Sequence, residues 1–273
     1  MKIIFAKNIG FCGGVKRAVD IARRSLEKDP SPIQFLGGVV HNEEVIREIE
    51  EKGGRFVSDP KEVKSGTLVI RAHGTPPFPA LKGVFIKDAT CPLVKKAQEA
   101  AKTLFKEGYR VIIIGEKDHP EVRGIQGYIE NKATVVESES EARKIKESKK
   151  IGVVAQTTQN MKKIRKILDV LRKRGKEIKF INTVCPEVLS RQKEISELLL
   201  KVKALLVIGS PTSANTNQLV KIAKSAKKQV WLANSVEDLK NANLKGVSVL
   251  GVVSGTSTPD WVIEKIKRYL MQL

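Results

Sequence analysis

The chain contains three cysteines, and each lies in the same local context. Cys12, Cys91 and Cys185 each precede a valine by three residues, and each opens a stretch in which apolar residues recur at helical spacing. Because residues that share a context in repeated segments occupy equivalent places, we expect the three thiols to converge on one point. Three thiolates from separate segments could bind zinc, an iron–sulfur cluster or no metal at all.

Polar residues follow each cysteine at two repeated distances. The first position, 28 or 29 residues after the cysteine, is occupied by His41, His119 and Ser213. The second position, 61 to 72 residues after the cysteine, is occupied by His73, Thr157 and Ser257. Imidazole, hydroxyl and amide groups donate hydrogen bonds to phosphate oxygens, so these residues and Asn215 predict a pocket for a small diphosphate.

Apolar and β-branched runs predict the strands that deliver these residues. The runs cover residues 3–6, 34–40, 67–72, 111–115, 151–154, 178–181, 204–208 and 247–253. Helical patterns follow each cysteine, cover residues 43–52 and 161–174, and resume near Gln218 and after Pro259. Each polar position thus follows the carboxyl end of a strand, where open α/β sheets place their ligands. A period of roughly 90 residues predicts three quasi-equivalent small α/β domains, at residues 13–92, 93–186 and 187–273, with residues 1–12 joining the third.

The charge balance limits the classes of partner. Among 273 residues, 50 Lys and Arg face 30 Asp and Glu, which gives a net charge of +20. Such a protein attracts phosphates, nucleic acids, anionic membranes or acidic proteins. A nucleic-acid-binding protein is the main alternative, but aromatic residues make up only 5% and no binding motif is recognisable. Without a long apolar stretch or a signal sequence, we expect no membrane partner and a cytoplasmic protein with reduced thiols.

Glu121 follows His119 by two positions, and Thr157 occupies the second polar position of the same repeat. A carboxyl group with neighbouring hydroxyls is the arrangement that delivers protons to a leaving oxygen. A surface ion pair with Arg123 is the alternative role for this glutamate.

The motifs together resemble a known family. They include Gly10 to Val15, Val40 to Asn42, Arg71 to Gly74, Asp88 to Pro92, His119 to Val122, Gln156 to Thr158, Asn182 to Cys185 and Gly209 to Asn217. From Met1 to the last helix, the chain resembles the 4-hydroxy-3-methylbut-2-enyl diphosphate reductase family, also called the LytB family. The resemblance implies the last step of the non-mevalonate isoprenoid pathway, a two-electron, two-proton reductive dehydroxylation that gives isopentenyl and dimethylallyl diphosphates.

The resemblance also implies a role for each residue. The three α/β domains would surround a central [4Fe–4S] cluster held by Cys12, Cys91 and Cys185, with one iron left free for the allylic hydroxyl of the substrate. The diphosphate would be bound by His41, His73, His119, Thr157, Ser213, Asn215 and Ser257, and Glu121, Thr157 and His119 would serve catalysis. Electrons would come from a ferredoxin- or flavodoxin-like donor. Ala214 departs from the serine that the family often has there, and Asn217 is the residue that would compensate. An iron–sulfur sensor without turnover is a further alternative.

Overall fold

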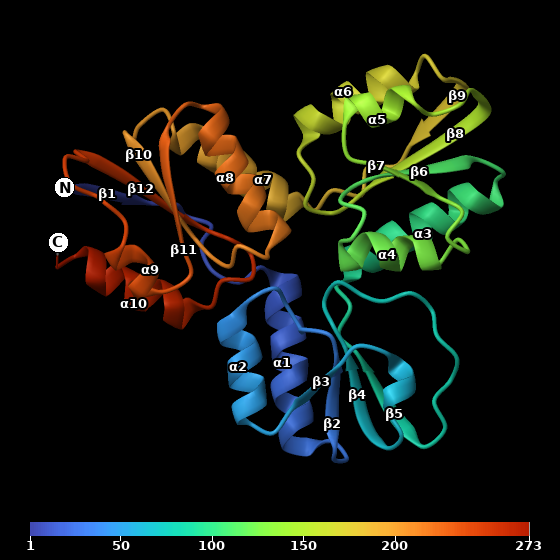
Figure 1. Ribbon diagram of the computed structural model, residues 1–273, viewed down its shortest axis with the longest axis horizontal. Coiled ribbons are helices and arrows are strands. Elements are labelled where there is room, and N and C mark those ends of the chain that lie inside the picture. The colour runs from blue at the N-terminus through green and yellow to red at the C-terminus, as the bar shows by residue number, and fades with distance from the viewer. Residues whose placement is uncertain (273) are drawn as a thin grey trace.

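Three parallel sheets of four strands, each covered by helices, make up the computed structural model, which describes residues 1–272 (Figure 1). The first sheet has the order β3-β2-β4-β5 and consists of β2 (Ile33–Leu36), β3 (Arg55–Val57), β4 (Gly66–Ile70) and β5 (Val84–Asp88). The second has the order β7-β6-β8-β9 and consists of β6 (Arg110–Ile114), β7 (Thr134–Val136), β8 (Ser148–Ala155) and β9 (Gly175–Phe180).

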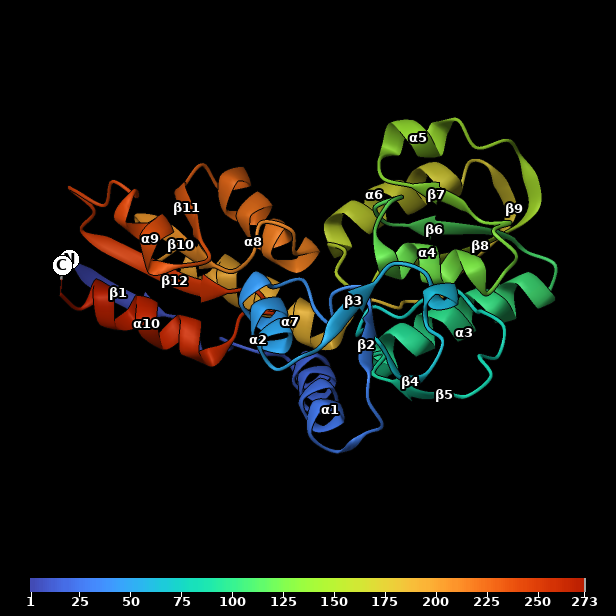
Figure 2. The ribbon, with the colours of Figure 1, turned by 60° about the horizontal axis from the view of Figure 1, so that its bottom comes forward.

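The third sheet is completed by the first strand of the chain. It consists of β10 (Ala204–Ile208), β11 (Gln229–Ala233), β12 (Val249–Ser254) and β1 (Lys2–Phe5), and its strand order is the same as in the other two sheets once β1 is placed last. Ile3 of β1 pairs with Leu250 of β12 in parallel register. The two ends of the chain therefore lie side by side (Figures 1 and 2).

Helices occur at equivalent places in the three units. The strands β1, β5 and β9, which end their sheets, are followed by α1 (Gly13–Lys28), α3 (Pro92–Lys106) and α7 (Pro186–Leu198). The strands β2, β6 and β10 are followed by α2 (Glu43–Glu51), α4 (Pro120–Gly127) and α8 (Ala214–Ser225). Short helices follow β3, β7 and β11, namely η1 (Pro60–Glu62), α5 (Glu139–Arg143) and α9 (Val236–Lys240). In the second unit α6 (Met161–Leu171) connects β8 to β9, and in the third unit α10 (Asp260–Leu270) follows β12, whereas residues 71–83 of the first unit, which include Pro76 and Pro77, connect β4 to β5 without a helix.

Hydrophobic residues on both faces of the central strands bind the layers of each unit together. In β6, Ile112 and Ile114 pack into one apolar cluster, and Val111 and Ile113 pack into another on the opposite face. This explains why β6 is a continuous apolar run, as is typical of parallel strands covered on both sides. The expected α/β fold of three quasi-equivalent units is confirmed.

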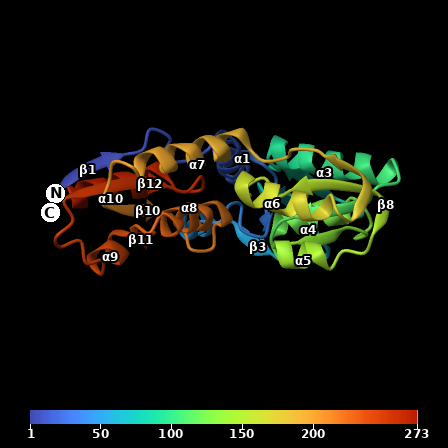
Figure 3. The same ribbon diagram turned by 90° about the horizontal axis from the view of Figure 1, so that it is seen from above.

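The three units surround a common centre and form a flat molecule. Figure 1 looks down on the three units, and Figure 3 shows α1, α3 and α7 along one side of the flattened chain. We propose to divide the chain at the sequence-based boundaries, residues 13–92, 93–186 and 187–273 with 1–12. No helix between residues 1 and 272 has the length and apolar character that crossing a bilayer requires.

Some expected element boundaries were wrong. The strand expected at 34–40 ends at Leu36, and α8 begins at Ala214 rather than near Gln218. The second difference arises because the side chain of Ser213 accepts a hydrogen bond from the backbone N–H of Thr216, which starts the helix four residues earlier. The strands β3, β5, β7 and β11 were not predicted from the sequence.

Candidate active site

All three cysteines precede a helix as its N-terminal capping residue. Cys12 caps α1, Cys91 caps α3 and Cys185 caps α7, and the last two are followed by a proline at the first helical position. The sulfur of Cys12 accepts a hydrogen bond from the backbone N–H of Val15 at 3.4 Å. The shared sequence context therefore corresponds to one local structure repeated three times.

The backbone of each cysteine is held at or next to the second polar position of its own unit. The N–H of Cys91 donates to the carbonyl of Ala72 at 2.9 Å, and the N–H of Cys185 donates to that of Thr157 at 2.9 Å. The N–H of Cys12 donates to the carbonyl of Thr256 at 3.1 Å, so this contact joins residues 1–12 to the third unit. Each of the three contacts places a cysteine beside a second polar position.

The three thiols line one cavity, as the sequence predicted. A Cβ atom placed on Gly14 would lie 2.6 Å from the sulfur of Cys91 and 3.9 Å from that of Cys12, so these two sulfurs approach one another over the bare backbone of Gly14. Cys185 raises the pKa of the Cys12 thiol by its charge, which likewise requires proximity. A glycine is needed here because any larger residue would displace a sulfur.

Burial dominates the acidity of the Cys12 and Cys185 thiols. It raises the pKa of Cys12 to about 11, with smaller contributions from Glu187, Cys185 and Cys91, and it also raises the pKa of Cys185. Three thiolates in one cavity repel one another, and the helix N-termini compensate for only part of that charge. A bound cation would offset the repulsion and release the thiol protons, so the donor set fits a thiophilic metal centre.

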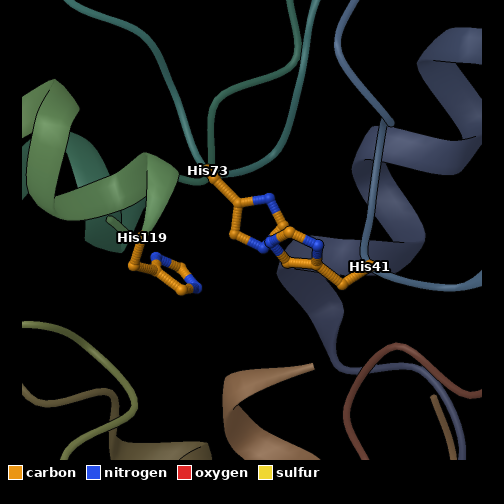
Figure 4. A group of neighbouring side chains, drawn as sticks. All are labelled: His41, His73 and His119. Carbon is orange, nitrogen blue, oxygen red and sulfur yellow. The ribbon is translucent and has the colours of Figure 1, made fainter. Parts of the chain in front are cut away.

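Three histidines from two units meet in the same cavity (Figure 4). The ring centroid of His41 lies 4.3 Å from that of His73 and 5.5 Å from that of His119. Burial and, to a smaller extent, the nearby guanidinium of Arg71 lower the pKa of all three, that of His119 to about 3, and repulsion from neighbouring rings adds to the shifts of His73 and His119. The imidazoles are therefore neutral at neutral pH in the ligand-free protein.

The neutral rings and their neighbours can donate hydrogen bonds into the cavity. The Nδ1 atom of His119 accepts from the N–H of Glu121, so its Nε2 carries the proton. The Nε2 atom of His41, the Nδ1 atom of His73 and both polar side-chain atoms of Asn215 are buried and have no partner among residues 1–272. Such atoms are costly unless a polar ligand pairs with them.

The third unit supplies hydroxyl groups beside Asn215. Ser213 and Ser257 are buried and line the cavity, and the hydroxyl of Ser257 donates to the carbonyl oxygen of His41 at 3.0 Å. Ala214 lines the cavity as well. Asn217 is not among the lining residues, and its amide donates to the carbonyl of Pro211 at 2.8 Å, so it does not replace the missing serine.

Glu121 lies in the first turn of α4, two residues after His119. It is 1% exposed, and burial raises its pKa to about 7. Its partner is Thr157, whose N–H and hydroxyl both donate to the carboxylate. Arg123 pairs with Asp118 at 2.8 Å, which contradicts the alternative of a surface ion pair for Glu121.

The structure thus brings every sequence-predicted site residue to one cavity. It adds Thr158 and Thr256, which also line the cavity and which the sequence did not single out. Thr158 has a buried hydroxyl without a partner among the described residues. Its position directly after Thr157 in the sequence is the feature that could have indicated it as a site residue.

Comparisons with known proteins agree with this site. A family model described as LytB protein matches residues 3–271. The chain belongs to the LytB protein family. It is 39% identical over 270 residues to 4-hydroxy-3-methylbut-2-enyl diphosphate reductase of Pelobacter propionicus. The matched region covers 97% of this chain and 96% of that relative. The protein of the same name from Caldanaerobacter subterraneus subsp. tengcongensis is also 39% identical, over 97% of this chain and 95% of the relative.

Solved structures share the fold of this LytB family member. The E-1-hydroxy-2-methyl-but-2-enyl-4-diphosphate reductase from Plasmodium falciparum is 29% identical and superimposes with a TM-score of 0.93 over 100% of this chain and 87% of the other. A structure of (E)-4-hydroxy-3-methyl-but-2-enyl diphosphate reductase, the terminal enzyme of the non-mevalonate pathway, is 37% identical and gives a TM-score of 0.69 over 100% of both chains. The similarity therefore covers all three units, and the family resemblance predicted from the motifs is confirmed.

Proposed function

We propose that this chain catalyses the reductive dehydroxylation of 4-hydroxy-3-methylbut-2-enyl diphosphate to isopentenyl and dimethylallyl diphosphates, the last step of the non-mevalonate pathway. One observation carries this conclusion. Buried polar atoms of His41, His73 and Asn215 without partners among residues 1–272 border the same cavity as three thiols. A cavity with anion donors on one side and metal ligands on the other suits a substrate with a diphosphate at one end and a reducible group at the other.

We infer that the three thiols hold a [4Fe–4S] cluster through Cys12, Cys91 and Cys185. The donor set supports this choice, because thiolates prefer iron–sulfur clusters or zinc, and a structural zinc site usually has four protein ligands. Three cysteine ligands would leave one iron without a protein thiolate. When bound, the cluster would pass on the two electrons of the reaction from an external donor, one at a time, and would offer an iron that can bind the hydroxyl group.

The diphosphate is bound by neutral donors in this proposal. His41, His73 and His119 face it from two units, and the hydroxyl and amide groups of the third unit face it from the other side, namely Ser213, Asn215 and Ser257. The described residues that line the cavity include no lysine or arginine. Uncharged donors in a dry cavity orient the anion by hydrogen bonds, and the nearby Arg71 adds a positive potential that acts over a short distance.

Proton delivery falls to Glu121 and Thr157. A carboxyl group with a pKa of about 7 holds a proton at neutral pH and releases it readily, as a general acid must. The Oε2 atom of Glu121 lies 2.8 Å from the hydroxyl oxygen of Thr157. When the carboxyl is protonated it donates to that hydroxyl, which in turn can donate to the oxygen that leaves the substrate. His119 shares the start of α4 and supplies a further donor at Nε2.

The electron donor is an acidic, ferredoxin- or flavodoxin-like protein in this proposal, because a net charge of +20 attracts such a partner. We also propose a cytoplasmic location, because thiols stay reduced there and the three cysteines must be reduced to bind a metal.

The test is anaerobic purification, followed by iron and sulfide analysis and turnover assays with the allylic diphosphate and a reduced dye. We expect a coloured protein that converts the substrate to two five-carbon diphosphates. A colourless protein that gains no iron on reconstitution would contradict the proposal. A loaded protein that binds but never converts the substrate would instead support a sensor.

A further inference from the structure

Glu43 connects the first unit to the third beside the proposed diphosphate site. It is the first residue of α2 and follows His41 by two positions. Its Oε1 atom accepts hydrogen bonds from the hydroxyls of Ser210 at 2.7 Å and Thr212 at 3.3 Å, and its Oε2 atom accepts from the amide of Asn234 at 2.8 Å. One carboxylate of the first unit therefore binds two segments of the third.

The loop that Glu43 contacts is internally bonded. The N–H of Thr212 donates to the hydroxyl of Ser210 at 3.1 Å, and the N–H of Ser213 donates to the carbonyl of Ser210 at 3.2 Å. The side chain of Ser213 then caps α8, whose second residue is Asn215. Because these contacts fix the loop as one body, the position of Ser210 sets the positions of Ser213 and Asn215.

The placement of a carboxylate here is unfavourable for anion binding alone. A negative charge two residues from His41 repels a diphosphate. Among the described residues that line the cavity, the single acidic one is Glu121. Glu43 is not a lining residue, and three donors together with the N-terminus of α2 compensate for its charge. A function in holding the loop explains why the charge is present.

We propose that Glu43 is a positioning residue for the diphosphate: its carboxylate holds the loop of Ser213 and Asn215 against the segment of His41. This inference rests on the proposed function. It names the residue that connects the diphosphate donors of the first unit to those of the third. Donors from both units must reach the same anion, and only a fixed spacing between the units allows this without a cost in ordering. Hydrogen bonds to a charged group are strong enough to fix such a spacing.

The experiment compares Glu43→Ala with Glu44→Ala in the anaerobically purified full-length enzyme. Glu44 is the next residue of the same helix and pairs with Arg47 within α2, so both variants lose the same charge at the same helix end. Affinity for inorganic diphosphate is measured by titration calorimetry, and KM and kcat are measured with the allylic diphosphate. We expect Glu43→Ala to weaken diphosphate binding and raise KM about tenfold, the effect of one charge-assisted hydrogen bond.

The other variants sharpen the comparison. Glu44→Ala should bind diphosphate as the wild type does or slightly more tightly, since only a negative charge is removed. Glu43→Gln should recover most of the affinity, because an amide can accept from Asn234 and donate to Ser210. The value of kcat should change less than about twofold in Glu43→Ala, since Glu121 and Thr157 lie in the second unit.

Several outcomes would overturn the proposal. Equal diphosphate affinity of Glu43→Ala and the wild type is one, and tighter binding by Glu43→Ala is another, since simple repulsion would explain it. If Glu43→Ala does not fold, Asn234→Ala removes one donor from the other side, and an unchanged affinity in that variant also overturns the proposal. A wild type that fails to bind diphosphate at all would contradict the proposed function instead.

Discussion

The carboxylate of Glu121 accepts two hydrogen bonds from one residue, Thr157, at 2.6 Å from its N–H and 2.8 Å from its hydroxyl. Both bonds stabilise the ionised carboxylate, yet burial outweighs them and raises the pKa to about 7. The backbone N–H of Cys185 donates to the carbonyl of the same Thr157. The proposed proton donor and a proposed cluster ligand are thus both held by Thr157.

Glu121 should set the upper limit of the pH range for turnover. We expect kcat to fall about tenfold per pH unit above pH 7, because the general acid loses its proton there. Glu121→Gln should lower kcat by about 10²-fold or more at every pH and abolish this dependence. A retained decline above pH 7 in the variant would assign the titration to another group.

The buried carboxyl of Glu121 should make the folded protein less stable as pH rises, whereas most acidic groups make it less stable as pH falls. Its pKa lies near 7 in the folded protein against an ordinary value of 4.5, so the unfolded chain ionises first and stability is lost as pH rises from 4.5 to 7. Glu121→Gln removes this loss. Thermal unfolding should therefore show a higher melting temperature for the variant than for the wild type at pH 8, and a smaller difference at pH 4.5.

Gly14 and Gly13 provide a matched pair for the proposed cluster site. A Cβ on Gly14 would lie 2.6 Å from the sulfur of Cys91, whereas a Cβ on Gly13 would have no atom within 4 Å. We expect Gly14→Ala to lose most of its iron after reconstitution, as Cys91→Ser should, and Gly13→Ala to retain it. Iron and sulfide analysis decides the matter, and equal iron contents of the two alanine variants would show that the thiols do not need this space.

Diphosphate binding should be accompanied by proton uptake. Burial and the charge of Arg71 keep His41, His73 and His119 neutral in the ligand-free protein, and an anion among them raises their pKa values again, so protons are gained on binding. Calorimetry of inorganic diphosphate in buffers of different ionisation enthalpy measures this number, with a chelator present to remove metal ions. Heats that do not depend on the buffer would show that the rings stay neutral.

Ala214→Ser should tighten diphosphate binding by a few-fold, about the effect of one added hydrogen bond. Ala214 is the first residue of α8 and lines the cavity between Ser213 and Asn215. Asn217→Ala is the control, since its amide serves the carbonyl of Pro211 outside the cavity. Weaker binding by Ala214→Ser would show that the cavity has no room for the hydroxyl.

Turnover with a natural acidic electron donor should slow as ionic strength rises. Screening shortens the range of attraction to the net charge of +20, so the association rate falls. Turnover with a small neutral reductant serves as the control and should change little. Rates that decline equally with both reductants would place the salt effect on the diphosphate site.

The repeated cysteine context and the polar positions were sufficient to predict the site, because each is tied to a regular element. The cysteine repeat became three helix caps, and the strand ends carried His119, Thr157 and Ser257 to the centre. The element boundaries were less predictable, since they depend on tertiary contacts: Ser213 starts α8 early through its cap, and in β11 only Ala233 is buried, while Gln229 is exposed and the three residues between them are half-buried.

Contacts between units were beyond the reach of sequence patterns. Glu43 reads as an ordinary first residue of a helix, where acidic residues are common, and nothing in its neighbourhood indicates Ser210 or Asn234. Such pairings are long-range and arise only when the three sheets are assembled. The repeated context predicted that Cys12 and Cys91 converge, but the place of Gly14 between them depends on the assembled units.

The pairing of β1 with β12 sets an order for assembly of the proposed metal centre. Cys12 is translated before Thr256, whose carbonyl accepts the hydrogen bond from the backbone N–H of Cys12. Until β12 and Thr256 emerge from the ribosome, one of the three thiols has no fixed place. Insertion of iron and sulfide is therefore expected to follow synthesis of β12, and a ribosome-stalled fragment ending before β12 is expected to remain without a cluster.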